Sequence, residues 1–349
     1  MRKRFAVICM ALACIHTVIL PFGEYQNSTL DITVGVSETE DSENETTNEK
    51  KYIKWIDFTP SAKALEDAMK TDIKTYGSKN HIKWTELLAL YSSIYGGKFE
   101  KYNTSSLSAL AEKILSGQKI SDLVANKKLF DYYLEAYGAV LGGMLGEFTE
   151  ITENPDGTQS AESKYGLRVF SPIAEGYYYN DYDDFGASRS YGYKRSHLGH
   201  DILGSIGTPI IAVESGYIEH LGWNQYGGWR IGIRSFDGKR YYYYAHLRKG
   251  HPYTDLYEGK IVNAGEVIGY LGMTGYSAKE DVNNINIPHL HYGLQIIFDS
   301  SQIDGWNQIW IDMYELTKFL SKNRSKVYRT SDSSDFFSKR YYEYPETPD

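Results

Sequence analysis

The hydrophobic pattern of the chain changes its period at about Val169, and this change restricts the fold more than any other feature. Beyond that residue, short apolar runs alternate with glycine-containing turns, with a period of two inside the runs. The runs cover residues 209–213, 216–223, 229–234, 240–247, 267–271 and 291–298. Asp237-Gly238 is a hairpin signal between two of them, because Asp-Gly suits a turn that needs positive φ. Short strands with regular turns predict an antiparallel sandwich or barrel-like sheet.

Before that point, from about residue 52 to residue 148, the apolar residues follow the period of a helix. The predicted helical stretches are 84–95, 107–115 and about 120–137, and an earlier helix is expected after Thr59-Pro60. Gly96 and Gly117 are the expected stops, and Ser105 or Ser106 is the expected N-cap of the 107–115 helix. These stretches predict a small helical bundle over residues 52–150, without a catalytic constellation.

The two regions together predict an α+β protein. A small N-terminal helical bundle is followed by an antiparallel β-sheet domain over residues 165–325. A short helical pattern returns after Trp310. Residues 326–349 are expected to form a polar, loosely held tail.

The first 51 residues predict export and a spacer. Arg2, Lys3 and Arg4 precede an apolar run over residues 5–22, which is typical of an export signal. A run of about 18 residues is near the lower limit for spanning a bilayer, so residues 1–22 are a cleaved signal peptide or a signal anchor. Residues 23–51 are expected to be a disordered acidic linker. The protein is therefore expected in the extracytoplasmic cell envelope, either secreted or anchored to the membrane through residues 5–22.

Composition excludes several kinds of site and partner. The chain has 37 Lys and Arg against 45 Asp and Glu, a net charge of −8, and this balance argues against a nucleic-acid partner, which favours a basic face. Cys9 and Cys14 are the two cysteines, and both lie in the export segment. The exported part therefore has no disulfide and no thiolate ligand or nucleophile. The sequence points to no particular protein partner.

Histidine is concentrated in one region of the chain. Seven of the nine histidines fall between His197 and His291. His289 and His291 are two positions apart, so they point to the same face of a strand. With His197, Asp201 and His246 they offer imidazoles and a carboxylate but no thiol. Zinc accepts nitrogen and oxygen ligands, and a catalytic zinc keeps three protein ligands and one open position. Two histidines and one carboxylate make such a site.

Several motifs follow one another in a fixed order: His197-Leu198-Gly199-His200-Asp201, Tyr244-Ala245-His246-Leu247, a glycine-rich turn over residues 269–275, and His289-Leu290-His291. In this order, over about residues 192–298, they resemble the lysostaphin/LytM-type zinc endopeptidases. The resemblance implies an antiparallel LytM-like peptidase fold that binds one zinc ion through His197, Asp201 and His291. It implies His246 and His289 as an unliganded catalytic pair, and a tyrosine that helps to hold the oxyanion, with Tyr191 and Tyr193 as candidates.

The resemblance also implies the reaction. Such enzymes hydrolyse peptide bonds in peptidoglycan stem peptides or cross-bridges, with zinc-bound water as the nucleophile and a histidine as the general base. Two features depart from the family pattern. A polar insert over residues 278–287 lengthens a loop beside the cleft, and Gly293 stands where many members have an acidic residue. Neither removes a ligand, but the insert leaves the substrate specificity open.

Other interpretations remain at this stage. A catalytically inactive relative that binds the cell wall or activates another hydrolase is the main alternative, although such proteins usually lose a ligand. A zinc D,D-carboxypeptidase is a further alternative. That class typically has a longer His-to-Asp spacing and a Glu-x-x-His element, and neither is found in this sequence. His200 is an alternative ligand to His197, whereas His220 and His251 are expected on the surface. The bond that is cleaved stays open, and so does the role of the helical segment, which is compatible with occluding the cleft, binding the wall or docking a partner.

Overall fold

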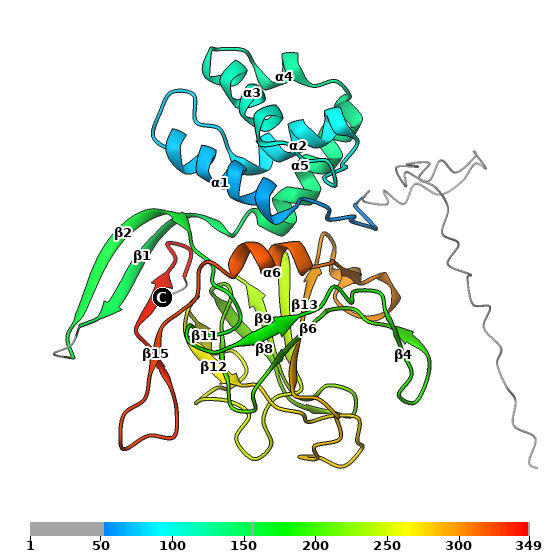
Figure 1. The fold of residues 1–349 in the computed structure, drawn as a ribbon, viewed down its shortest axis with the longest axis vertical. Helices are drawn as coiled ribbons and strands as arrows, with labels where there is room; N and C mark the ends of the chain where they lie inside the picture. Colours follow the sequence, from blue (N-terminus) through cyan, green and yellow to red (C-terminus); the bar gives the residue numbers. More distant parts are fainter. Residues whose placement is uncertain (1–51, 155–156, 348–349) are drawn as a thin grey trace, which may run out of the picture. The chain divides into compact units, whose positions relative to one another are not determined.

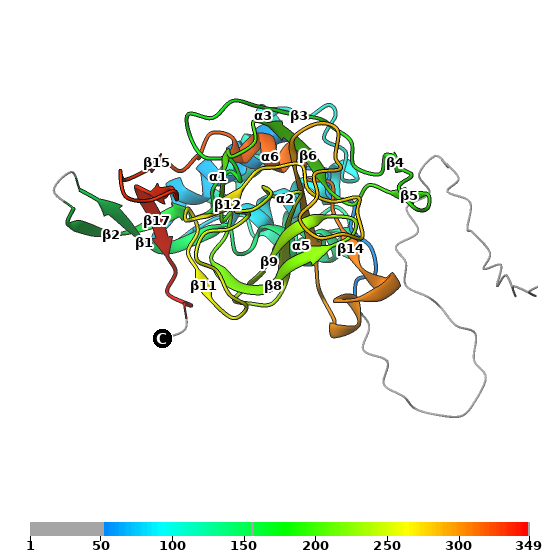
Figure 2. The same ribbon diagram turned by 90° about the horizontal axis from the view of Figure 1, so that it is seen from below.

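The computed structural model describes residues 52–154 and 157–347, so the expected export signal and acidic linker lie outside it. Five helices come first, and antiparallel sheets and a sixth helix follow (Figures 1 and 2). The helices are α1 (Ala62–Thr75), α2 (Trp84–Tyr95), α3 (Thr104–Leu115), α4 (Ile120–Leu123), α5 (Lys127–Leu141) and α6 (Tyr314–Leu320), with short 3-10 helices at Ser300–Gln302 and Gly305–Asn307. This order confirms the α+β class. Within the described ranges, no helix has the length and apolar character to cross a membrane.

Two helix ends lie where the sequence predicts them. The first helix begins just after Pro60, with Ser61 as the N-cap whose hydroxyl accepts a hydrogen bond from the backbone N–H of Ala64. The second helix ends at Gly96, which has a left-handed φ of 65°. Glycine takes this conformation without steric strain, so the chain turns sharply there.

Two other helix boundaries differ from the prediction. Asn103 caps α3, in place of Ser105 or Ser106, and its side chain accepts a hydrogen bond from the backbone N–H of Ser105 at 2.8 Å. The stretch 120–137 forms two helices, because Asn126 is extended and caps a new helix through the backbone N–H of Leu129 at 3.1 Å. In both places an asparagine side chain replaces a missing helical hydrogen bond.

The strands pair antiparallel throughout the described residues, as the sequence predicts. The main sheet has the order β11-β8-β9-β10-β13-β6-β3, with β14 on β13; β17-β1-β2, β12-β7, β15-β16 and β4-β5 form smaller sheets. The strands are β1 (Leu145–Glu153), β2 (Gln159–Leu167), β3 (Tyr179–Asp181), β4 (Ser188–Arg189), β5 (Arg195–Ser196), β6 (His200–Gly204), β7 (Pro209–Ile211), β8 (Gly216–Asn224), β9 (Gly228–Ser235), β10 (Arg240–Ala245), β11 (Ile261–Val262), β12 (Val267–Tyr270), β13 (His289–Ile296), β14 (Ile309–Trp310), β15 (Val327–Tyr328), β16 (Phe337–Ser338) and β17 (Arg340–Glu343).

The central strands of the main sheet have one face in the core and one face on a cleft. Tyr242, Tyr244 and Leu294 are fully buried in the hydrophobic core. Tyr241 and Tyr243 alternate with them along β10 and line the cleft. The run of four tyrosines therefore serves both faces, because successive side chains of a strand point to opposite sides.

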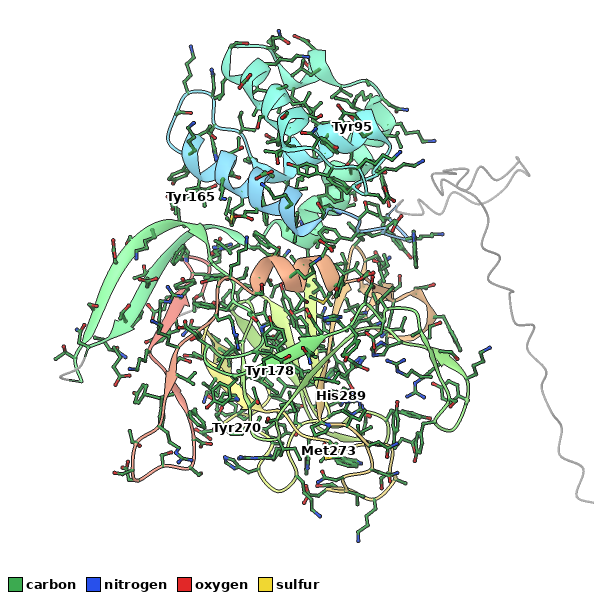
Figure 3. The ribbon with its side chains drawn as sticks, in the orientation of Figure 1. Tyr95, Tyr165, Tyr178, Tyr270, Met273 and His289 are labelled. Atoms are coloured by element: carbon green, nitrogen blue, oxygen red, sulfur yellow. The ribbon has the colours of Figure 1, made fainter. Side chains whose placement is uncertain are left out.

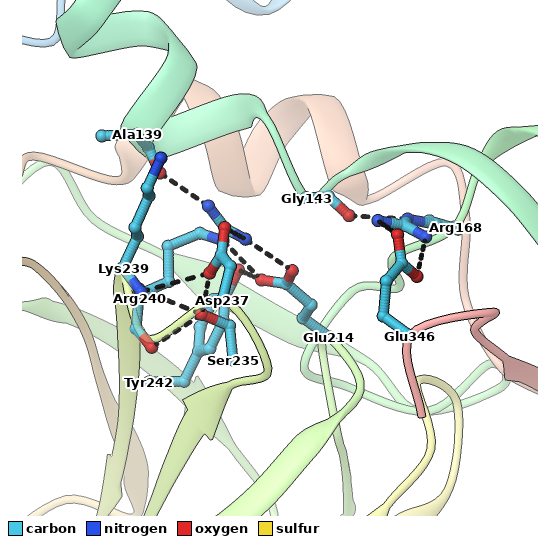
Figure 4. Close-up of polar contacts among 10 residues, drawn as sticks. All are labelled: Ala139, Gly143, Arg168, Glu214, Ser235, Asp237, Lys239, Arg240, Tyr242 and Glu346. Atoms are coloured by element: carbon cyan, nitrogen blue, oxygen red, sulfur yellow. Dashed lines mark hydrogen bonds and ion pairs between the residues drawn. The ribbon is translucent and has the colours of Figure 1, made fainter. Parts of the chain in front are cut away.

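A buried ion pair joins the end of α5 to the main sheet (Figure 4). Arg240 and Glu214 are only 1% and 3% exposed, and Arg240 Nε lies 2.8 Å from Glu214 Oε2. Arg240 Nη1 also donates to the carbonyl oxygen of Ala139, in the last turn of the helix, at 2.7 Å. Tyr242 Oη donates to the same carboxylate at 2.6 Å. The sheet thus satisfies a carbonyl that the helix leaves without an internal partner.

The C-terminal residues differ from the expected loosely held tail. The last strand, β17, pairs with β1, with Tyr341 opposite Ile151. Tyr342 and Tyr344 are buried, with 4% and 6% exposure, and Glu346 forms an ion pair with Arg168 at 2.9 Å (Figure 4). This segment is held because it completes a sheet whose other strands come much earlier in the chain.

Candidate functional site

Neighbouring strands of the main sheet bring the five predicted site residues together. His291 lies on β13 opposite Asp201 on β6, and His289 lies two positions before His291. His197 precedes β6, and His246 directly follows β10, the other neighbour of β13. Antiparallel pairing therefore makes residues far apart in the sequence adjacent in space.

Three of the five residues form a compact cluster of nitrogen and oxygen ligand atoms. His197 Nε2 lies 2.8 Å from His291 Nδ1 and 3.0 Å from Asp201 Oδ1, and His291 Nδ1 lies 3.2 Å from Asp201 Oδ1. Ligand atoms around a tetrahedral zinc ion, with bonds of about 2.0–2.1 Å, are roughly 3.3 Å apart. The donor set and its spacing therefore fit a zinc ion with one open position.

The protonation of two of these ligands, Asp201 and His291, also suits a cation. Burial opposes the charge of Asp201, but hydrogen bonds with His197 and His291 hold the pKa of this carboxyl well below its ordinary range. Burial lowers the pKa of His291, which keeps that imidazole neutral. Metal ligands must be deprotonated carboxylates and neutral imidazoles, so both groups are in the form that binds a metal ion.

Asp184 orients the first of these ligands. The backbone carbonyl oxygen of Asp184 lies 3.0 Å from His197 Nδ1, and its carboxylate lies 3.3 Å from the same nitrogen. Because a carbonyl oxygen only accepts, His197 carries its proton on Nδ1 and turns Nε2 toward the ligand cluster. Burial opposes the charge of this imidazole, but Asp184 and Asp201 raise the pKa of His197 to about 9. The surroundings of His197 therefore favour a positive charge.

Arg189, on β4, holds the carboxylate ligand from its other side. Its Nη2 donates to Asp201 Oδ2 at 2.9 Å and to Asp184 Oδ2 at 2.6 Å. Asp201 Oδ1 is thereby left to face the two histidines. Asp184 and Arg189 thus connect His197 with Asp201. Within the described residues, neither of them pairs with His291, the third member of the cluster. The sequence prediction did not include either residue. The one local signal for Asp184 is a group of three acids, Asp181, Asp183 and Asp184, shortly before the first ligand.

A glycine allows the ligands to approach one another. A Cβ atom on Gly199 would meet the Cε1 atom of His291 at 2.6 Å, inside contact distance. This position lies between His197 and Asp201 in the sequence, so the backbone passes directly against the opposing imidazole. Gly199 is therefore required because a larger residue at this position would clash with His291.

His246 is held in an unusual backbone conformation beside the cluster. Its φ is 61°, a left-handed value that a residue with a Cβ seldom takes. Its Nδ1 donates to the carbonyl oxygen of Thr274 at 2.8 Å, so its Nε2 is free to accept a proton. Burial, together with the nearby His289 and His291, lowers the pKa of His246 well below its ordinary value. The imidazole is therefore neutral, with Nε2 as its unprotonated nitrogen.

His289 completes the unliganded pair. Its ring centroid lies 4.8 Å from that of His246. Its Nδ1 donates to the carbonyl oxygen of Ile287 at 2.8 Å, and its Nε2 lies 3.7 Å from Asp201 Oδ1. Both unliganded histidines therefore have their Nδ1 proton fixed by a backbone carbonyl and their Nε2 turned to the site.

Tyrosines border the site, but not as the sequence predicts. Tyr191 stacks on Tyr276, with ring centroids 4.6 Å apart and an interplanar angle of 3°, and Tyr193 packs on Tyr226. Tyr226 and Tyr276 line the cleft, whereas the two candidate tyrosines pack on them and are not among its lining residues. Tyr276 is the nearer ring to His246, with centroids 5.9 Å apart, so it is a better candidate than Tyr191 for a phenol near the reacting groups.

The cleft that contains these residues has a volume of about 440 Å³. It extends over the exposed face of the main sheet, from the ligand cluster to Arg234 and Tyr241. Asn284, Ile285 and Asn286 of the polar insert line it, as expected for a lengthened loop at its border. Figure 3 labels His289 inside the β domain and Tyr95 at the far end of the molecule, in the helical bundle. No described residue of α1–α5 lines the cleft, so this segment does not occlude it.

The other histidines of the region have separate environments. His200 points away from the ligand cluster and packs against Tyr314, because it alternates with Asp201 on β6. His251 pairs with Asp335 at 2.6 Å. His220 lines the cleft, although the sequence predicts a plain surface residue. Hence His197, not His200, belongs to the ligand cluster.

The antiparallel sheet, the three-ligand cluster and the two unliganded imidazoles in one cleft define a domain of the metallopeptidase class. Residues 195–304 match the model of Peptidase family M23. The chain thus carries an M23 domain of the lysostaphin/LytM endopeptidase type, as the sequence motifs indicate.

Individual relatives match part of the chain. The L-Ala–D-Glu endopeptidase of Bacillus subtilis is 36% identical over 155 residues, which cover 44% of each chain. Lysostaphin of Staphylococcus staphylolyticus is 40% identical over 97 residues, 28% of this chain and 18% of lysostaphin. Glycyl-glycine endopeptidase ALE-1 of Staphylococcus capitis is 33% identical over 135 residues, 38% of this chain and 32% of that protein. The matches span less than half the length of each of these relatives.

Proposed function

We propose that the protein is an exported zinc metalloendopeptidase that hydrolyses peptide bonds in peptidoglycan. The observation that carries this proposal is the division of the five site residues into two groups. Three residues turn ligand atoms toward one point, and two further imidazoles, each with its Nδ1 on a backbone carbonyl, turn Nε2 toward the same place from outside the cluster. A binding protein without activity has no need for the second group.

His197 Nε2, Asp201 Oδ1 and His291 Nδ1 would hold one zinc ion per peptidase domain. When bound, zinc supplies Lewis-acid chemistry, which activates a water molecule and polarises a carbonyl oxygen. The chain supplies the orientation: Asp184 fixes the Nδ1 proton of His197, and Arg189 occupies the second oxygen of Asp201.

His246 is the proposed general base. Its fixed Nδ1 proton and its lowered pKa leave Nε2 as an unprotonated acceptor near neutral pH. It takes a proton from the attacking water at Nε2 and later delivers it to the leaving amine. Its left-handed backbone places the ring over the cleft at the end of β10.

His289 and Tyr276 are placed to support the carbonyl oxygen as it gains negative charge. When protonated at Nε2, His289 donates from the side of Asp201. The ring of Tyr276 also lines the cleft, with its centroid 5.9 Å from that of His246. Donors that are fixed before the reaction stabilise the developing charge without reorganisation.

Peptidoglycan peptides are the proposed substrate, on the strength of the M23 family match and of relatives named for endopeptidase activity. Two of the relatives are named for different bonds, L-Ala–D-Glu and glycyl-glycine, so the bond does not follow from similarity. Peptidoglycan lies outside the cytoplasmic membrane, which agrees with the export signal in residues 1–22.

The test separates metal binding from catalysis. His291→Ala is expected to lose both zinc and activity, whereas His246→Ala is expected to keep zinc and lose activity. Bound zinc is measured by elemental analysis of the purified protein, and activity by new peptide termini released from purified cell walls.

Two outcomes would contradict the proposal. Wild-type protein that binds less than about half an equivalent of zinc and releases no peptide would favour an inactive wall-binding protein. Equal loss of zinc in both variants would show that the roles of His246 and His291 are assigned wrongly. Identification of the new termini names the bond.

A further inference from the structure

The cleft contains more arginine charge than its own carboxylates neutralise. Four arginines line it: Arg189, Arg195, Arg230 and Arg234. The lining carboxylates are Asp201, Glu219 and Asp304. Asp201 also belongs to the ligand cluster, and Asp304 is exposed at the rim without an ion pair in the described part of the chain.

Three of the four arginines have partners that account for their position. Arg189 pairs with Asp184 and Asp201. Arg234 is almost fully buried and forms two hydrogen bonds with Glu219, one of them at 2.8 Å. Arg195 donates to the carbonyl oxygen of Tyr191 and lies among tyrosine rings, 5.0 Å from the centroid of Tyr226.

Arg230 is the exception. It forms no ion pair within the described residues, and its Nε is buried without a hydrogen-bond partner. Its neighbour and hydrogen-bond partner in the cleft is the uncharged phenol of Tyr243. A half-buried guanidinium loses hydration, and a phenol does not neutralise its charge. The group is therefore set to receive an anion from outside the chain.

The position of Arg230 relates this group to the ligand cluster. It directly precedes Ile231, whose partner on β10 is Tyr244, and Tyr244 pairs with Tyr292 on β13. Ile231 points to the core, so Arg230 points to the cleft face, level with Ala245 and with its partner His291. Two strand spacings of about 4.8 Å separate their backbones by roughly 10 Å. An extended peptide covers that distance with about three residues.

We infer that Arg230 forms a carboxylate-binding subsite, and that the cleft selects a peptide with a free carboxylate within about three residues of the cleaved bond. The inference rests on the proposed function and narrows its substrate from peptidoglycan peptides in general to acidic stem peptides. An uncharged glycine bridge does not satisfy Arg230. Arginine binds a carboxylate through two parallel hydrogen bonds, which gives both affinity and direction.

The experiment uses the full chain loaded with zinc and two pairs of tetrapeptides, L-Ala–γ-D-Glu–L-Lys–D-Ala. The first pair differs only in a carboxylate or a carboxamide at the α-carbon of D-Glu, with an amidated C-terminus. The second pair differs only in a free or an amidated C-terminus, with the D-Glu carboxamide. The measurements are kcat/KM for hydrolysis and, in the His246→Ala background, the Kd by calorimetry.

The wild-type chain is expected to prefer the carboxylate member of one pair by roughly tenfold to hundredfold, the usual effect of a charge-assisted hydrogen bond. The pair that is discriminated identifies which carboxylate is bound. Arg230→Gln should reduce this preference to about twofold or less, with an unchanged zinc content and Tm. Lys239→Gln removes one charge from the turn of the same β9–β10 hairpin, where Lys239 is exposed, and should keep the preference.

The possible failures are distinguishable. Equal hydrolysis and equal binding of both members of both pairs overturns the subsite and leaves the proposed function standing. A preference that survives in Arg230→Gln also overturns the subsite. If no tetrapeptide and no purified cell wall is hydrolysed, the proposed function fails, and the calorimetric comparison still decides whether Arg230 binds a carboxylate.

Discussion

At the scale of single residues, the ligand cluster depends on side chains that offer it no ligand atom. Asp184 and Arg189 form a closed chain of hydrogen bonds between His197 and Asp201. Such outer groups fix the tautomer of a histidine ligand and the direction of a carboxylate ligand. Metal affinity therefore depends on residues that no ligand motif includes.

Asp184→Asn and Arg189→Gln are expected to weaken zinc binding by about 10- to 100-fold, because each releases one ligand from its orientation. Competition with a chelator of known affinity measures this change. Activity should return when zinc is in excess. Asp183→Asn, at the exposed neighbouring position, serves as the control and should bind zinc like the wild type. An unchanged zinc Kd in both test variants would contradict the positioning role.

The sequence predicts all five residues of the cluster and the unliganded pair, because their motifs have fixed spacings and a family resemblance. It does not predict Asp184, Arg189 or Arg230. Their importance comes from what the fold places opposite them, and no local pattern encodes that. Tyr191 illustrates the same limit: the prediction finds the right cluster of tyrosines, but packing turns Tyr276 to the cleft instead.

At the scale of elements, the contact between α5 and β10 depends on one buried pair of charges. The guanidinium of Arg240 lies between the carboxylate of Glu214 and the carbonyl oxygen of Ala139. Gly143 makes room for it, since a Cβ atom there would meet Arg240 Nη2 at 2.1 Å. Removing one partner of such a pair leaves a buried charge that nothing else neutralises fully.

Glu214→Gln is expected to lower the free energy of unfolding by about 3–5 kcal/mol, the usual effect of breaking a buried ion pair. Urea denaturation followed by tryptophan fluorescence measures it. Glu162→Gln breaks the pair of Glu162 with Lys164, in which Glu162 is 71% exposed, and is expected to change the same quantity by less than about 1 kcal/mol. If both variants lost a similar free energy of unfolding, the buried pair would contribute no more to stability than the exposed one.

Some elements follow from the sequence and others do not. The strands near residues 216–223 and 229–234 are predicted well, because alternation and the Asp237-Gly238 turn are both local signals. The two helices in the 120–137 stretch are predicted as one, since an asparagine cap competes with an apolar period that continues through it. The final strand is missed, because its partner β1 comes much earlier in the chain and no local signal connects the two.

At the scale of the whole molecule, one hydrophobic cluster includes residues of the helical segment and of the main sheet. Leu88 and Tyr137 belong to the same cluster as Tyr242 and Leu294. Residues 52–150 therefore contribute to the core that lies behind the cleft, although they do not line the cleft itself. The boundary between the two predicted domains stays a prediction, but the cluster opposes independent folding of the β domain.

A fragment of residues 165–325 is expected to unfold without a cooperative transition and to bind a hydrophobic dye. It lacks Ala139, which accepts from Arg240, and the strand containing Tyr342, which packs on Phe170. Residues 52–349 provide the control and should unfold cooperatively. Calorimetry compares the two proteins, and equal values of Tm would refute the dependence.

The left-handed backbone at His246 has an evolutionary consequence. A side chain with a Cβ is strained at this φ, whereas glycine is not. Among the substitutions that remove the imidazole, glycine therefore strains the backbone least. In a lineage that no longer needs hydrolytic activity, backbone strain would therefore not oppose replacement of His246 by glycine. The proposed general base is therefore kept by its proposed chemistry and not by its backbone conformation, which glycine would adopt with less strain.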